Sequence, residues 1–250
     1  AIGAIYVSNI DADEDIKLLQ IYARQAASSI NNAFLHSLVN TKNEELNNTY
    51  AQLKTRYMDT IEVLRLAVDA KDEYTRGHSD RVAYYSTRIG EKLGLSSGEL
   101  EQLRIAGIFH DIGKIGTADD ILLKSLSLSE EEYAEVKQHP IKGAMILSAV
   151  SMFQDIVPIV RHHHEHYDGS GYPDGIKGEE IELFARIISV ADAFDAMMSD
   201  RHYRKHLTLD QTREQLRLGA GTQFDKAIIN EFLRMLDDDA ELHASLAITS

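Results

Sequence analysis

Cysteine is absent from the 250-residue chain. Disulfides, zinc fingers, iron–sulfur clusters and thiol catalysis are therefore excluded. Long apolar runs are missing as well: the longest clear candidate, residues 143–154, is far shorter than the run of about 18 residues that a membrane-spanning helix needs. Because the chain also lacks a signal-peptide pattern, we expect no membrane span within this segment and a cytoplasmic location.

Positive charge is scarce, with 26 Lys and Arg against 40 Asp and Glu and a formal net charge of −14. Such an acidic chain is a poor match for a nucleic acid polymer, which binds basic surfaces. A small anionic substrate fits only if the site supplies local positive charge, for which metal ions are the simplest source. The composition, with 44% apolar residues, is otherwise ordinary for a globular protein of one or two domains.

Residues 1–38 combine one strand pattern with one helix pattern. Residues 1–7 alternate in a β-like way and stop at a turn signal, Ser8-Asn9. An acidic stretch then leads into apolar positions at helical spacing. One strand and one helix are too little to form a core, so we expect the remnant of an upstream domain. The chain starts without Met, and we expect it to be an excerpt of a longer protein.

Residues 39–68 predict a linker helix, because no Pro or Gly occurs between about residues 31 and 70. Six positions spaced alternately by four and three form the a/d stripe of a coiled coil: Leu46, Tyr50, Leu53, Tyr57, Thr60 and Leu64. A parallel homodimer through this helix is the corresponding prediction. The alternative is a monomeric helix that lies on its own domain.

Residues 69–250 predict an all-α domain. Three capping-box signatures precede apolar helical runs: Ser96 with Glu99, Ser129 with Glu132, and Thr208 with Gln211. The run from Phe184 to Phe194 has helical periodicity, and no second strand pattern is convincing. The fold class is therefore an all-α bundle that follows a long linker helix and a short strand–helix remnant.

Histidine is abundant, with eleven residues in the chain. Histidines clustered with carboxylates are ordinary ligands of first-row metals where thiolate is absent. His110 and Asp111 are adjacent, and Lys114 follows one turn later, where a cation beside a metal suits a phosphate held between them. Taken alone, this His-Asp pair is also compatible with a surface or capping pair.

A second histidine-rich element runs from Arg161 to Pro173 and includes His163, His164 and a glycine-containing loop. Its alternative explanation is a solvated polar turn. Three further candidates, each of which alone is more often structural, are His78, His139 and Asp192.

These segments resemble the two signatures of HD-GYP domains, a branch of the HD phosphohydrolases that hydrolyse cyclic di-GMP. The similarity extends from about Lys71 to Leu233 and includes the segments 74–79, 185–188, 192–195 and 221–225. It implies an HD-type helical bundle around a metal site. Residues 1–38 are similar to the last strand and helix of a GAF sensor domain.

The resemblance implies two divalent metal ions and a set of ligands for them. Its ligand positions are His78, His110, Asp111, His139, His163, His164 and Asp192, and Asp111 is the expected bridging carboxylate and a catalytic residue. Tyr74 stands where some members have a Glu ligand for a third metal, which favours two ions. Fe or Mn suits such a donor set, although the sequence does not choose among Fe, Mn, Ni, Zn and Mg.

The resemblance also implies a substrate-binding set. Lys114, Arg201 and Arg204 are expected to contact phosphate, with Lys114 also catalytic, and Gly171, Tyr172 and Pro173 to form the loop beside the site. Arginine presents a planar fork to phosphate oxygens, and Tyr172 could stack on a guanine. The chain departs from the family pattern at 125–127 and at His202, which should alter loop stiffness and access.

The resulting hypothesis is a phosphodiesterase that hydrolyses cyclic di-GMP to pGpG and/or GMP by two-metal activation of a bridging hydroxide. The upstream sensor domain would regulate it, and diguanylate cyclases are candidate partners. Two alternatives stay open: an HD phosphohydrolase acting on another nucleotide or cyclic dinucleotide, and a non-catalytic module that binds the messenger.

Overall fold

A computed structural model describes residues 13–69, 77–122, 124, 127–200 and 205–238. The strand predicted for residues 1–7 lies outside them. The helices are α1 (Asp13–Asp69), α2 (His78–Lys92), α3 (Ser97–Phe109), η2 (Ile112–Gly116), α4 (Asp119–Leu122), α5 (Glu130–Val136), α6 (His139–Ser148), η3 (Ser151–Ile156), α7 (Val157–His162), η4 (Gly178–Glu180), α8 (Leu183–Met198), α9 (Leu209–Gly219) and α10 (Lys226–Asp238).

The all-α prediction is confirmed for the part of the chain that the structure describes. The β pairing found there is a single isolated bridge, Ala220 with Phe224. None of the described helices is both long enough and apolar enough to cross a bilayer.

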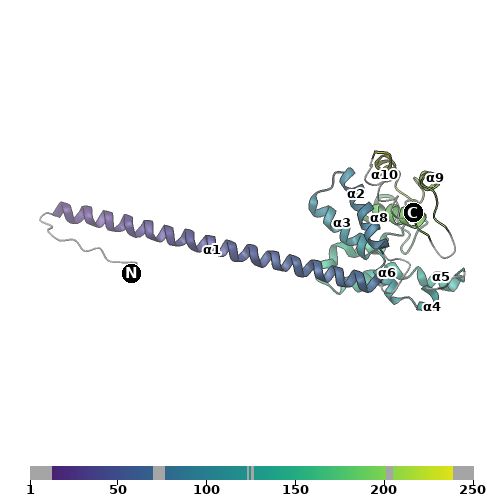
Figure 1. The fold of residues 1–250 in the computed structure, drawn as a ribbon, viewed down its shortest axis with the longest axis horizontal. Helices are drawn as coiled ribbons and strands as arrows, with labels where there is room; N and C mark the ends of the chain where they lie inside the picture. The colour runs from purple at the N-terminus through teal and green to yellow at the C-terminus, as the bar shows by residue number, and fades with distance from the viewer. Residues whose placement is uncertain (1–12, 70–76, 123, 125–126, 201–204, 239–250) are drawn as a thin grey trace. The chain divides into compact units, whose positions relative to one another are not determined.

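Helix α1 is one uninterrupted helix of 57 residues, drawn from purple to blue in Figure 1. It passes without a break through the predicted boundary between residues 38 and 39. The chain divides into two compact units, residues 1–60 and 61–250, so the last turns of α1 belong to the second unit. In that unit Ile61 is buried, and Arg65 forms an ion pair with Asp80 of α2 at 3.0 Å.

The second unit is built on the packing of α2 against α3 and α8, which lie side by side in Figure 1. Its centre is an aromatic stack: Phe194 of α8 meets Tyr85 of α2 and Phe232 of α10 edge to face, with ring centroids 5.0 Å apart in both pairs. Both phenylalanines are fully buried. The apolar periodicity of α8 therefore faces the core, as its sequence predicted.

Local signals in the sequence set several helix ends. All three predicted capping boxes form, at the starts of α3, α5 and α9. Gly94 ends the turn after α2 with a φ of 78°, a left-handed conformation that glycine adopts without steric cost. These interactions join residues close together in the chain, so they are visible in the sequence.

The aromatic stack yields a test of the core. Replacing Phe232 by Ala removes a fully buried ring and leaves a cavity, so we expect the free energy of unfolding to fall by about 3–5 kcal/mol in urea titrations. Leu218→Ala is the control. Because the Leu218 side chain is exposed, this substitution should lower the free energy of unfolding by less than about 0.5 kcal/mol. Equal effects of the two variants would contradict the assigned core.

Candidate metal centre

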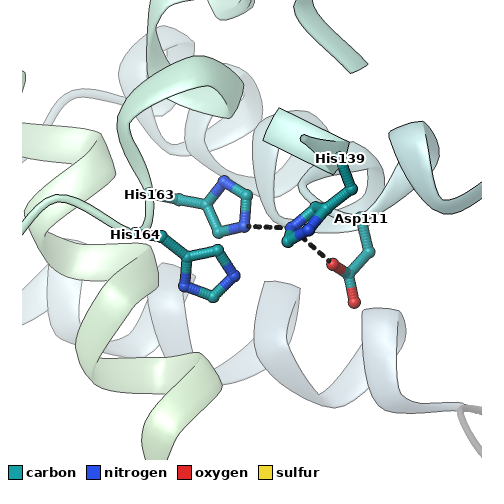
Figure 2. Close-up of side chains that lie close together, drawn as sticks. All are labelled: Asp111, His139, His163 and His164. Carbon is teal, nitrogen blue, oxygen red and sulfur yellow. Dashed lines mark hydrogen bonds and ion pairs between the residues drawn. The ribbon is translucent and has the colours of Figure 1, made fainter. Parts of the chain in front are cut away.

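Two groups of metal-type donors lie inside the second unit. The first is Asp111, His139, His163 and His164, and the second is His78, His110 and Asp192. Within each group the nearest nitrogen and oxygen atoms lie within 4.8 Å of one another. Figure 2 shows His163 and His164, from one segment, facing His139 and Asp111. The structure thus gathers all seven of the ligand positions expected from the sequence.

Asp111 stands between the two groups. Its Oδ1 lies 3.3 Å from His139 Nε2, in the first group. Its Oδ2 lies 3.3 Å from His110 Nε2 and 3.7 Å from His78 Nε2, in the second. Each carboxylate oxygen therefore faces a different group, which is the arrangement that a bridging ligand needs.

Two glycines allow the helices that carry these donors to approach. A Cβ on Gly107 of α3 would lie 2.8 Å from the Ala83 Cα, so α2 and α3 cross closely near His78 and His110. A Cβ on Gly113 would overlap the backbone carbonyl of His139. Glycine at this position therefore lets η2, which follows Asp111, rest directly against the start of α6.

Backbone carbonyls orient three of the histidines. The Nδ1 atoms of His110, His139 and His163 lie 2.7, 2.8 and 2.7 Å from the carbonyl oxygens three residues earlier, at Gly107, Val136 and Val160. Nδ1 therefore carries the proton, and Nε2 is left as the lone-pair donor. These Nε2 atoms face the interior of the two groups.

A carboxylate orients His78 in the same way. Its Nδ1 lies 2.7 Å from Asp195 Oδ2, and Arg81 donates to both oxygens of Asp195 at 2.6 and 3.0 Å. Asp195 was part of the segment 192–195 but was not singled out from the sequence. Its position three residues after Asp192 on α8, one helical turn away, is the signal that was available.

The electrostatics separate the donors into charged carboxylates and mostly neutral imidazoles. Burial alone would raise the pKa of Asp111, but the Lys114 ammonium and His110 hold the pKa well below its usual range. Burial lowers the pKa of His163 well below its usual range. Burial, together with the nearby His139, lowers the pKa of His164 to about 3. Burial opposes the charge on His78 too, but Asp192 and Asp195 outweigh it and raise its pKa to about 9.

Carboxylates and neutral imidazoles crowded in the interior are the ordinary ligand set of a divalent first-row metal. The Nε2 atoms of His139 and His163 lie 3.3 Å apart, and without a cation their lone pairs would repel one another in a medium of low dielectric constant. The residues present therefore fit a metal centre.

Comparison with known proteins agrees with this chemistry. A family model described as "HD domain" matches residues 62–228, most of the second unit. The chain belongs to the HD-domain family. The His110-Asp111 pair that was expected to carry the resemblance lies within the match. The GAF-like part, upstream of it, stays a prediction, as do the domain boundaries at residues 38 and 68.

Several relatives of this HD domain carry named activities. The cyclic di-GMP phosphodiesterase response regulator RpfG of Xanthomonas campestris is 38% identical over 73% of this chain and 49% of its own length. A 3′3′-cGAMP-specific phosphodiesterase of Vibrio cholerae is 39% identical over 69% of this chain and 38% of its own length. A cyclic di-GMP phosphodiesterase of Thermotoga maritima is 36% identical over 82% of this chain and 57% of its own length. The chain thus matches roughly half the length of these relatives.

Solved structures support the fold. The cyclic GMP-AMP phosphodiesterase V-cGAP3 of V. cholerae aligns with a TM-score of 0.57 at 18% identity, over 76% of this chain and 53% of the other. An HD-GYP-type protein of Bdellovibrio bacteriovorus, Bd1817, aligns with a TM-score of 0.54 at 21% identity, over 71% of this chain and 64% of the other. The predicted HD-type bundle is confirmed.

In this HD domain Lys114 contacts Asp111 directly, with its Nζ 2.6 Å from Oδ2. The sequence suggested an anion held between the lysine and the metal. Because η2 is a 3₁₀ helix with three residues per turn, Lys114 stands directly above Asp111, so the two side chains meet.

The loop that contains Gly171, Tyr172 and Pro173 folds back tightly onto the backbone just after His164. A Cβ on Gly171 would come within 2.6 Å of the Glu165 backbone, which makes glycine necessary there. The buried Glu165 accepts hydrogen bonds from the backbone N–H groups of Asp174 and Gly175 at 2.6 and 3.0 Å. This leaves Tyr172 with its ring 5.0 Å from that of His164, so the loop does border the metal centre. Pro173 follows it, half-buried.

Five further positions complete the comparison with the sequence. Arg201 and Arg204 lie outside the described residues, as do Tyr74 and His202. His162 stands outside both donor groups, and its ring nitrogens contact Glu182 at 2.7 Å and Asp174 at 3.0 Å.

Asp195 provides a test of how the centre is held. Asp195→Asn keeps the shape of the side chain but removes the charge that orients and polarises His78. We expect the affinity for Mn²⁺, measured by calorimetry, to fall about 10- to 100-fold. Asp155→Asn, an exposed carboxylate, is the control and should bind as the parent protein does. Unchanged affinity in the Asp195 variant would show that the His78–Asp195 contact has no influence on metal binding.

Proposed function

We propose that this chain is a metal-dependent phosphodiesterase that hydrolyses cyclic di-GMP to pGpG and/or GMP. The observation that carries the proposal is the pair of adjacent donor groups that share Asp111. The names of RpfG and of the T. maritima relative point to the same substrate. The relatives match only through part of their length, so the substrate is a proposal for this chain.

In this proposal the seven donors hold two divalent ions, with Fe or Mn as the preferred metals. The first group supplies three imidazoles and the second two, with Asp192 as the additional carboxylate. Such nitrogen and oxygen ligands without thiolate suit iron and manganese. When bound, the ions supply Lewis-acid charge for the phosphate and a hydroxide nucleophile near neutral pH.

The protein's own groups position the substrate and stabilise the developing charge. Lys114, half-buried beside Asp111, is placed to add positive charge to the phosphoryl oxygens. Tyr172 offers a ring next to His164 on which a guanine can stack. Arg201 and Arg204 are proposed as further phosphate contacts on the sequence resemblance alone.

A second candidate substrate is another cyclic dinucleotide. The V. cholerae relative named as a 3′3′-cGAMP-specific phosphodiesterase is as similar to this chain as RpfG is. Chromatography of the products from cyclic di-GMP and from 3′3′-cGAMP, each supplied alone and then together, separates the two candidates by their relative kcat/KM.

The central test replaces His110 and Asp111 by Ala, separately. Each change deletes a donor, and the second deletes the carboxylate whose two oxygens face different groups. We expect bound metal to fall and cyclic di-GMP hydrolysis to drop at least about a hundred-fold in kcat. His36→Ala, an exposed histidine of α1, should keep full metal content and rate. Undiminished hydrolysis in the Asp111 variant would refute the assignment.

We further propose that the chain forms a parallel homodimer through α1. The predicted stripe lies within this helix, and Leu46, Tyr50 and Leu53 are 66%, 69% and 65% exposed in the single chain. A second copy would cover these side chains in a coiled coil. A sensor domain upstream could then act on the HD domain through the paired helices, if its ligand binds two states of the pair with different affinity.

Sedimentation velocity tests the dimer. Leu46→Glu with Leu53→Glu places two charges in the stripe of each helix, and we expect the dimer to dissociate. Asn48→Glu with Thr55→Glu adds the same charge on the opposite side of α1 and should leave the dimer intact. A parent protein that sediments as a monomer and hydrolyses its substrate fully would contradict the proposal.

A further inference from the structure

Lys137 differs from its neighbouring lysines in how its charge is balanced. Lys124 forms an ion pair with Glu132 at 2.7 Å, and Lys142 pairs with Glu135, also on α5. Among the described residues, Lys137 has no carboxylate within ion-pair distance. In a chain of net charge −14, a half-buried ammonium without a carboxylate partner is a notable exception.

Two tyrosine rings surround Lys137 instead. Its Nζ lies 4.7 Å from the ring centroid of Tyr133 and 5.2 Å from that of Tyr172. Cation–π contacts of this kind hold the ammonium in place without neutralising its charge. Tyr133 is 51% exposed, so its ring still has surface for another planar group.

This cluster adjoins the metal centre. Tyr172 lies 5.0 Å from His164 between ring centroids, and Lys137 precedes His139 by two residues at the junction of α5 and α6. Lys114, the other cation of the centre, contacts Asp111 itself. Lys137 is therefore a second positive charge near the donor groups, in contact with the same Tyr172 ring that lies against His164.

We propose that Tyr133, Lys137 and Tyr172 form a second substrate subsite, in which Lys137 binds the phosphate that is not being cleaved and Tyr133 stacks on a base. The inference rests on the proposed function and adds residues to it. A cyclic dinucleotide carries two phosphates, and when one lies at the metal centre the other must lie across the ring. A pre-positioned cation flanked by aromatic rings matches a phosphate attached to a purine nucleoside.

The subsite also separates substrates by size. A diester with a single phosphate, such as bis(p-nitrophenyl) phosphate, reaches the donor groups and Lys114 but has nothing to place beside Lys137. Substitution of Lys137 should therefore affect the cyclic dinucleotide and spare the small diester.

The experiment compares three variants, Lys137→Gln, Lys137→Arg and Tyr133→Ala. The control is Lys92→Gln, which changes an exposed lysine of α2. Each protein is the full chain loaded with Mn²⁺. For Lys137→Gln we expect KM for cyclic di-GMP to rise about ten-fold with kcat nearly unchanged, because a contact made equally in the ground and transition states is lost. Lys137→Arg should restore most of the affinity. Tyr133→Ala should raise KM several-fold, and the rate on bis(p-nitrophenyl) phosphate and the metal content should not change.

An unchanged KM in Lys137→Gln overturns the subsite, as does an equal loss on both substrates accompanied by loss of metal. If the parent protein binds cyclic di-GMP without hydrolysing it, the proposed function fails, but equilibrium binding still decides the subsite. About ten-fold weaker binding by Lys137→Gln then supports it. Equal binding by the two proteins, or none by the parent protein, overturns it.

Discussion

The position of the Asp111 carboxylate is the constraint on which the rest of the centre depends. One oxygen faces His139 and the other faces His110 and His78, so this side chain links the two donor groups. A buried carboxylate is costly unless its charge is balanced, and the Lys114 ammonium at 2.6 Å provides that balance. Directly after Asp111, Gly113 brings η2 into close contact with α6, which carries His139.

Helix ends supply most of the orientation of the ligands. The last carbonyls of an α-helix have no partner within the helix, and each must find a donor elsewhere. The Nδ1–H groups of three histidines fill this role at the ends of α3, α5 and α7. The same hydrogen bond therefore satisfies the helix terminus and leaves Nε2 as a metal donor. His78 departs from this scheme, because a buried carboxylate, Asp195, takes the place of the carbonyl.

The distribution of positive charge bears on the substrate. In an acidic chain, most cations near the centre are paired: Arg81 with Asp195 and Arg161 with Asp174, in addition to Lys124 and Lys142. Among the described residues, positive charge for a substrate would then come from bound metal, from Lys137, and from Lys114 beside Asp111. A small substrate with two phosphates can contact all three, whereas a nucleic acid polymer would also meet the surrounding acidic surface.

The sequence by itself determined what depends on residue type and short spacing: the helical class, the capping boxes of α3, α5 and α9, and, through the resemblance, which seven side chains to expect as donors. It could not supply their geometry, because His78 and Asp192 are more than a hundred residues apart and meet only once α2 packs on α8. Asp195 was missed for the same reason, since a carboxylate on a helix looks alike whether it faces water or a histidine. Only the tertiary structure decided that Asp111 divides its oxygens between two groups and that Lys137 lies between two tyrosines, because both depend on helix packing at glycine contacts and on the path of a loop.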